Sequence, residues 1–139
     1  VKLVATMTVT RREQINNYFR GAGTVPLTEA EREKFKEELG PYELVPVGGR
    51  VAGLSSTIGG DEKNVVNAAR RIYDYVLDHM RYGKEGTGWG NGDTLWACDS
   101  GYGNCTDFHS LFMSIAKAKG IPARFHMGFP ISEQHGEGA

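Results

Sequence analysis

The sequence lacks most of the features that point directly to a class of function. It has no run of about 18 apolar residues, the length that an apolar helix needs to cross a bilayer. It has no excess of one charge, because 16 Lys and Arg stand against 17 Asp and Glu and the formal net charge is −1. This balance gives no electrostatic reason to expect nucleic acid or an anionic membrane as a partner.

Cysteine is also scarce. The two cysteines, Cys98 and Cys105, are too few for a scaffold built on disulfides, and they leave the redox compartment open. No acidic cluster has the spacing of a calcium-binding loop, and we expect no cofactor. The chain has neither an initial methionine nor a recognisable signal peptide, so we expect that it was processed or cut from a longer protein.

Glycine and a regular hydrophobic pattern are present. The 139 residues have the length of about one domain, and the 19 glycines predict many turns. Thr28 and Glu31 form a capping box before the first predicted helix, and Asp61 is the expected cap of the second. The apolar periodicity predicts half-buried strands over residues 2–10 and 123–129, a short strand interrupted by Pro46, and helices over residues 28–39, 61–82 and 106–119.

A long connection, residues 83–104, precedes the third helix. It holds seven glycines and both tryptophans, Trp89 and Trp96. Connections of this length inside a compact domain are usually functional or disordered. Large aromatic side chains need a surface to pack against, so the tryptophans argue against disorder.

Cys105 follows Gly101 and Gly103 and lies in the first turn of the third helix. A helix N-terminus presents unpaired N–H groups and a partial positive charge, which stabilise a thiolate and can face a developing oxyanion. The thiolate is the nucleophilic form of cysteine. The helical wheel puts the sulfur at the rim of the apolar face. The residues alone leave two roles open: a nucleophile, or a small apolar residue packed under the loop.

His109 lies one turn after Cys105, close enough to contact it. It is either the partner of the thiol in an ion pair, a metal ligand together with Cys98, Cys105 and His126, or a structural or substrate-side residue. The spacing of the two cysteines and His109 matches no common zinc motif, so we expect no metal site. His126 alternates away from the apolar side of its predicted strand and either lines a cleft or lies on the surface.

The segment from Gly103 to Ile131, GNCTDFHSLFMSIAKAKGIPARFHMGFPI, resembles the core of bacterial transglutaminase-like proteins, which have the papain-like cysteine-peptidase fold. Two features carry the resemblance: a cysteine preceded by a glycine and one further residue, and the sequence Gly-Ile-Pro-Ala-Arg at the end of the helix. Residues 68–93 also resemble the helix and loop that come before this point in the family. The likeness covers residues 60–131.

The resemblance implies an α+β fold, in which a helical part with the nucleophile helix is followed by the first strand of an incomplete antiparallel sheet. Residues 1–50 would be the end of an accessory β-rich region plus a short helix, and residues 51–139 the N-terminal half of the transglutaminase-like core. Together with the missing methionine, such an accessory region favours a location outside the cytoplasm, although no feature of the chain shows it.

The resemblance also implies a reaction. Cys105 would attack an amide carbonyl of a protein or peptide substrate, and the resulting thioester would be resolved by an amine or by water. The further candidates for lining the groove or stabilising the oxyanion are Trp89, Trp96, Asn104, His109 and His126.

The chain departs from the family at the general base. That base is a histidine on a later strand, oriented by an Asp or Asn, and no histidine of this sequence occupies the matching place. Because such a triad acts as a unit, we expect a fragment that ends before the base and is inactive or nearly so. The alternative is a non-catalytic relative that binds a peptide or protein.

Overall fold

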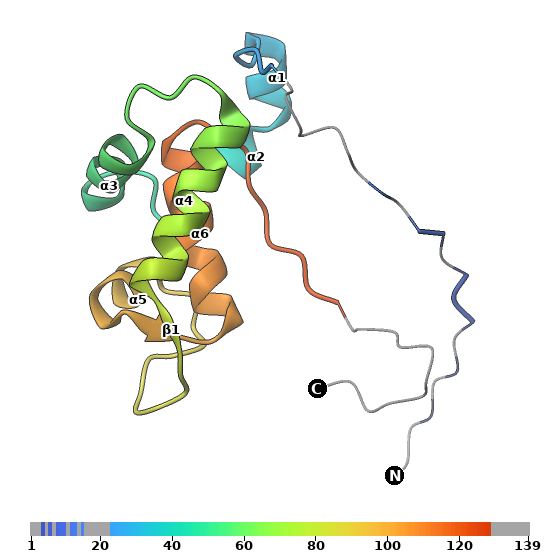
Figure 1. Cartoon of the computed structure of the whole chain (residues 1–139). Coiled ribbons are helices and arrows are strands. Elements are labelled where there is room, and N and C mark those ends of the chain that lie inside the picture. Colours follow the sequence, from blue (N-terminus) through green and yellow to red (C-terminus); the bar gives the residue numbers. More distant parts are fainter. Residues whose placement is uncertain are drawn as a thin grey trace.

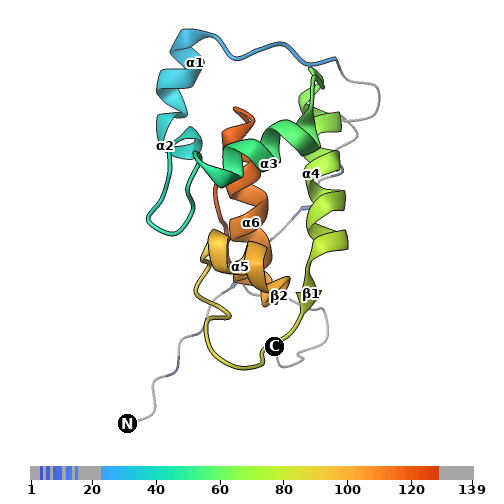
Figure 2. The ribbon, with the colours of Figure 1, turned by 90° about the vertical axis from the view of Figure 1, so that its left-hand side faces the viewer.

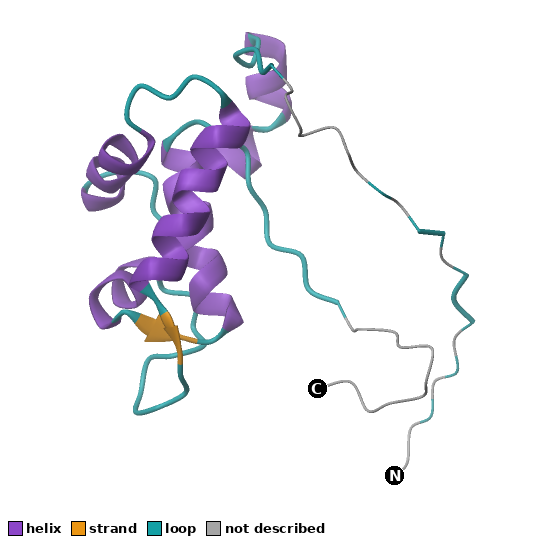
Figure 3. Ribbon diagram, in the orientation of Figure 1, coloured by secondary structure: helices purple, strands orange, loops and turns teal. Residues whose placement is uncertain are grey.

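The computed structural model describes residues 23–128 as one continuous segment, and residues 4, 6, 8–10, 12–13 and 15 before it. Of the strand predicted over residues 2–10, residues 4, 6 and 8–10 are described and form no strand. Its other residues lie outside the described ones, and so does the end of the strand predicted over 123–129. The described part is a group of short helices with a two-stranded sheet at one end (Figures 1 and 3). None of the described helices is long and apolar enough to cross a membrane.

The helices begin where the sequence offers a capping side chain. Thr28 and Glu31 form the predicted capping box of α1. The second predicted helix begins later than expected, because Asn64 rather than Asp61 accepts the first N–H groups of α4. In chain order the described elements are α1 (Glu29–Lys34), α2 (Lys36–Leu39), α3 (Arg50–Gly59), α4 (Val65–His79), β1 (Arg81–Tyr82), α5 (Thr94–Ser100), β2 (Tyr102–Gly103) and α6 (Cys105–Ala118).

Helix α6 is the centre of the packing. Figure 2 shows α3 crossing it, α4 running beside it and α5 lying against its beginning. Leu111, Ile115 and Ala116 of α6 have no exposed surface. Each fully buried aliphatic side chain of this size stabilises the fold by about 1.5–3 kcal/mol. The buried core consists of Val51, Ile72, Val76, Met80, Ala97, Cys98, Leu111, Ile115 and Ala116.

The sheet of the described residues is parallel, not antiparallel as predicted. The N–H of Arg81 donates to the carbonyl of Gly101 at 2.9 Å, and the N–H of Gly83 donates to the carbonyl of Gly103 at 3.0 Å. The pairing is parallel because the chain returns through α5 to lie beside the end of α4, in the manner of a crossover. Residues 121–128 follow α6 without forming a described strand, since no described segment pairs with them.

Two helices were not predicted. Helix α3 follows the short strand predicted around Pro46, in residues for which we predicted no helix, although Val51, Leu54 and Ile58 recur at helical spacing. Helix α5 lies inside the predicted long connection, where the side chain of Asp93 accepts the N–H groups of Leu95 and Trp96. The third predicted helix is confirmed as α6, ending before Gly120, whose φ is 85°.

Candidate functional site

Cys105 is the first residue of α6, and it is exposed. Asn104 caps the helix: its side-chain oxygen accepts the N–H of Thr106 at 2.9 Å, and its carbonyl accepts the N–H groups of Asp107 and Phe108 at 3.1 Å. The N–H of Cys105 makes no hydrogen bond to any described residue. The thiol therefore lies beside an unpaired N–H group at the positive end of a 14-residue helix.

A buried carboxylate holds the connection before α5 against this helix end. Asp107 has no exposed surface, and one of its oxygens accepts the N–H of Gly90 at 2.6 Å and of Asn104 at 2.9 Å. The other oxygen accepts the N–H of Gly92 at 3.1 Å. Asp107 also completes the capping box of α6 with Asn104. The carboxylate thus joins the loop and the helix at the residue before Cys105.

The backbone of the loop is shaped to bind that carboxylate. Gly88, Gly90 and Gly92 have φ values of 100°, 83° and 68°, and no described residue other than glycine has a positive φ. Alternating signs of φ along a chain turn successive N–H groups toward one point, which forms an anion-binding concavity. We call residues 88–92 the glycine cradle.

The glycine cradle also packs against the aromatic side chain of Trp96. The indole of Trp96 lies so close to Gly88 that a Cβ there would be 2.5 Å from its Nε1. Trp96 meets the ring of Tyr102 edge-on, with ring centroids 5.3 Å apart, and the hydroxyl of Tyr102 donates to the carbonyl of Glu85 at 3.3 Å. A Cβ at Gly103 would collide with the carboxylate of Asp107, so glycine at that position lets the strand approach.

The combination of an exposed cysteine at a helix start and a loop fixed beside it fits the family suggested by the sequence. A family model for the transglutaminase-like superfamily matches residues 52–138. The chain belongs to this superfamily. The matched part of this transglutaminase-like chain contains Cys105, the glycine cradle and the sequence Gly120–Arg124.

One curated relative gives a second comparison. A protein of Haemophilus influenzae Rd, described as an uncharacterized protein, is 35% identical to this chain over 78 residues. The matched segment is 55% of this chain and 21% of the relative, so the chain spans about a fifth of the length of the curated relative it matches. No solved structure matches the chain significantly.

Two hollows flank the first turns of α6 in this transglutaminase-like chain. The first, of about 290 Å³, lies beside the cradle, and its wall includes Asn91, Gly92 and Thr106. The second, of about 340 Å³, lies between α4 and α6 and is lined by Tyr73, Val76, Leu77, Phe108, His109 and Phe112. Both hollows are lined in part by residues from the first turns of α6.

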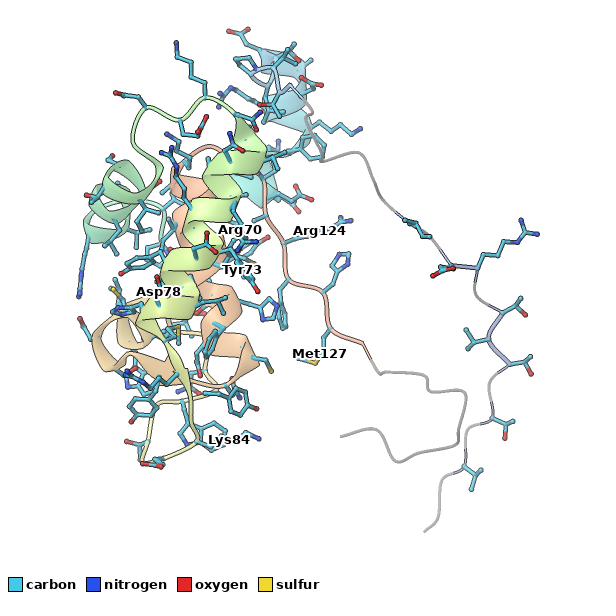
Figure 4. All side chains as sticks on the ribbon, viewed as in Figure 1. Arg70, Tyr73, Asp78, Lys84, Arg124 and Met127 are labelled. Carbon is cyan, nitrogen blue, oxygen red and sulfur yellow. The ribbon has the colours of Figure 1, made fainter. Side chains whose placement is uncertain are left out.

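The described histidines are engaged elsewhere than at the thiol. His109 Nδ1 lies 2.5 Å from the carbonyl oxygen of Cys105, and its ring meets Phe125 edge-on at 5.0 Å. His79 Nε2 lies 2.7 Å from the carbonyl oxygen of Cys98. His126 is exposed on the segment after α6, which also carries Arg124 and Met127 (Figure 4). None of these three rings bonds to the thiol of Cys105.

The two tryptophans differ in their surroundings. Trp96 packs under the cradle, against the core. Trp89 is half-buried within the cradle itself. Lys84, at the outer end of the connection between β1 and α5 (Figure 4), has its ammonium nitrogen 5.9 Å from the Trp89 ring. Trp89 thus belongs to the cradle itself, whereas Trp96 belongs to the packing beneath it.

The two cysteines differ in exposure: Cys98 is buried and Cys105 is exposed. Neither forms a disulfide. Among the described residues, no three His, Cys, Asp or Glu side chains gather as a metal site would require. The structure therefore does not bring Cys98, Cys105 and His109 together as ligands.

Asp107 is the site residue that sequence reasoning missed. A signal was present, because Asn104 and Asp107 have the spacing of a capping box directly before an apolar helical pattern. The alternation of glycine at positions 88, 90 and 92 was the second signal, since it is the pattern of a backbone concavity that needs an anion.

Proposed function

We propose that Cys105 is the nucleophile of a cysteine enzyme that acts on amide bonds of proteins or peptides. The thiolate attacks the carbonyl carbon, a C–S bond forms, and the C–N bond breaks as the leaving amine takes a proton. An amine or water then attacks the thioester and frees the thiol. The observation that carries this proposal is the exposed Cys105 at the start of α6 in a chain of the transglutaminase-like superfamily. Members of that superfamily are usually cysteine peptidases or acyltransferases.

The oxyanion of the tetrahedral intermediate would be stabilised by the backbone at the helix start. The N–H of Cys105 has no partner among the described residues, whereas Asn104 already occupies the N–H of Thr106 and Asp107. A donor that is unpaired in the resting state is free to bind charge that develops during the reaction. Removing one such donor from an enzyme typically costs a factor of about 10²–10³ in rate.

The general base is the part that the described residues do not supply. None of His79, His109 and His126 bonds to the thiol. We therefore propose that a histidine and a carboxylate outside residues 23–128 complete the site, in a papain-like arrangement. An acyl donor with a good leaving group still tests the nucleophile, because its reaction needs no acid to protonate the leaving group.

The alternative is a non-catalytic module that binds a peptide. The same absence of a histidine at the thiol favours it, and the hollow beside Asn91 and Thr106 would receive the ligand. The two functions differ in whether Cys105 forms a bond to the substrate.

The test uses the whole chain and N-benzyloxycarbonyl-glycine p-nitrophenyl ester, with intact-mass and peptide-mass detection. The proposal predicts one acyl group per chain, located on Cys105, retained in Cys98→Ala, absent in Cys105→Ser and removed by hydroxylamine as a thioester is. An unmodified Cys105, or an equal label on other residues in Cys105→Ser, contradicts it.

A further inference from the structure

We infer that Asp107 is a positioning residue: through the glycine cradle it fixes the wall of the hollow that receives the acyl chain beside Cys105. This inference rests on the proposed function, and it concerns a residue that does not touch the reacting atoms. The carboxylate of Asp107 is fully buried, and it accepts all three of its described hydrogen bonds from backbone N–H groups. Two of these groups belong to the cradle, and the third belongs to the helix cap.

The contacts place the cradle on both sides of the nucleophile. A Cβ at Gly90 would lie 3.0 Å from the side-chain nitrogen Nδ2 of Asn104, the residue before Cys105. A Cβ at Gly92 would lie 3.1 Å from the methyl group of Thr106, the residue after Cys105. The loop therefore runs in close contact with the side chains of the residues before and after Cys105, and its distance from them is set by Asp107.

The cradle carries the residues that face a substrate. Its N–H groups at Gly90 and Gly92 point to Asp107, whereas Asn91 between them is exposed and lines the hollow of about 290 Å³ together with Gly92 and Thr106. Loss of the Asp107 carboxylate would let this wall of the hollow move and would leave the Cys105 side chain itself unchanged. The expected effect is on the recognition of an extended acyl group and much less on the intrinsic reactivity of the thiol.

Asp107→Asn is the sharpest variant because it preserves size and shape. An amide keeps one accepting oxygen and places an NH₂ group where the other oxygen stood, so at least one backbone N–H group faces a donor. Asp93→Asn is its matched control, since Asp93 caps α5 at the end of the same loop and Asn is an equally good cap.

Glycine variants provide a second route if Asp107→Asn does not fold. Gly90→Ala introduces a side chain at φ 83° and against Asn104, whereas Gly86→Ala introduces one at φ 69° with only the Tyr102 hydroxyl nearby, at 3.8 Å. Both variants place a side chain on a residue with a positive φ and are strained for that reason, but only Gly90 donates a hydrogen bond to Asp107.

The experiment measures two quantities on the whole chain. The first is amide hydrogen exchange of Gly90 and Gly92. The second is the ratio of the rate constants for acylation of Cys105 by N-benzyloxycarbonyl-glycine p-nitrophenyl ester and by p-nitrophenyl acetate. The two esters share a leaving group and differ in the acyl chain, so the ratio reports the wall of the site and cancels a change in the thiol.

Asp107→Asn and Gly90→Ala are expected to speed the amide hydrogen exchange of the cradle at least tenfold and to lower the ratio of the two acylation rate constants at least fivefold. The controls Asp93→Asn and Gly86→Ala should change each of these quantities less than twofold. Faster exchange with an unchanged ratio overturns the inference, and so does unchanged exchange. A wild-type chain that neither ester acylates at Cys105 overturns the proposed function and this role with it. The exchange data still show whether Asp107 holds the loop, so the two failures are distinguishable.

Discussion

His109 Nδ1 lies 2.5 Å from the carbonyl oxygen of Cys105, one helical turn before it. A carbonyl only accepts hydrogen bonds, so Nδ1 must carry the proton and donate it. The ring is held further by the edge contact with Phe125. His109 therefore lines the hollow between α4 and α6, and its Nδ1 is bonded to the backbone of α6 rather than to the thiol of Cys105.

This relationship predicts that His109→Gln leaves the nucleophile intact. The rate of alkylation of Cys105 by iodoacetamide should stay within about twofold of the wild-type rate between pH 5.5 and 8, because no proton passes between the two side chains. Peptide mapping after timed alkylation measures it. A tenfold decrease that follows the titration of a single group would show that His109 is the base after all.

Gly103 is predicted to be irreplaceable for steric reasons. A Cβ there meets the carboxylate of Asp107, which cannot move without breaking its three hydrogen bonds. Gly103→Ala should lower the free energy of unfolding by about 1–3 kcal/mol, the usual range for overpacking. Gly53→Ala is the control, because Gly53 lies within α3 with nothing within 4 Å of its Cβ position. It should be neutral or stabilising by up to about 1 kcal/mol. Urea unfolding compares the two, and equal effects would contradict the packing argument.

Lys117 is a buried ammonium group that joins α6 to the end of α2. Its Nζ donates to the carbonyls of Gly40 at 2.8 Å and Glu37 at 3.3 Å, and it lies 3.5 Å from the centre of the Tyr42 ring. Burial lowers the pKa of this side chain, yet the group is fully hydrogen-bonded to the backbone. Lys117→Met keeps the volume but leaves these carbonyls without their donor.

The predicted loss for Lys117→Met is about 1–3 kcal/mol in the free energy of unfolding, the cost of unsatisfied buried acceptors. Lys36→Met is the matched control, since Lys36 is exposed and pairs only with exposed Glu33. It should change stability by less than about 1 kcal/mol. A Lys117→Met protein as stable as the control would show that apolar burial offsets the lost hydrogen bonds.

Tyr75 gives a prediction for alkaline pH. Burial, and next the neighbouring Cys98, raise the pKa of the Tyr75 hydroxyl above its usual value of 10.0. The folded state then keeps a proton that the unfolded chain loses. The contribution of this hydroxyl to stability is complete below pH 10 and is lost as the pH rises through the folded-state pKa. Between pH 8 and 11, the stability of the wild-type chain should fall more steeply than that of Tyr75→Phe, as measured by urea unfolding at each pH. Parallel curves would contradict the raised pKa.

The sequence predicted the parts of the fold that depend on local chemistry. The capping box at Thr28 and the span of α6 both depend on neighbouring residues, and the structure confirms them. Helix α3 was missed because Gly48, Gly49 and Gly53 weaken its helical pattern, although Val51, Leu54 and Ile58 pack against the core. The direction of the sheet depends on how the chain returns through α5, which no local pattern encodes.

The site shows the same division. Cys105 at a helix start is readable from the sequence, because both the cap and the apolar pattern lie within a few residues of it. The hydrogen bonds that Gly90 and Gly92 donate to Asp107 join residues 17 and 15 positions apart in the sequence. They depend on a loop geometry that composition does not specify. The assignments of Trp89, Trp96, Asn104, His109 and His126 to the groove or the oxyanion stay predictions.

The most direct test of the central claim is the rate at which iodoacetamide alkylates Cys105 in the folded Cys98→Ala chain at pH 7, compared with the rate for N-acetylcysteine amide. If Cys105 is the nucleophile, we predict alkylation at least tenfold faster than for the model thiol, because a helix N-terminus favours negative charge. A Cys105 that reacts no faster than the model thiol would contradict its role as the nucleophile.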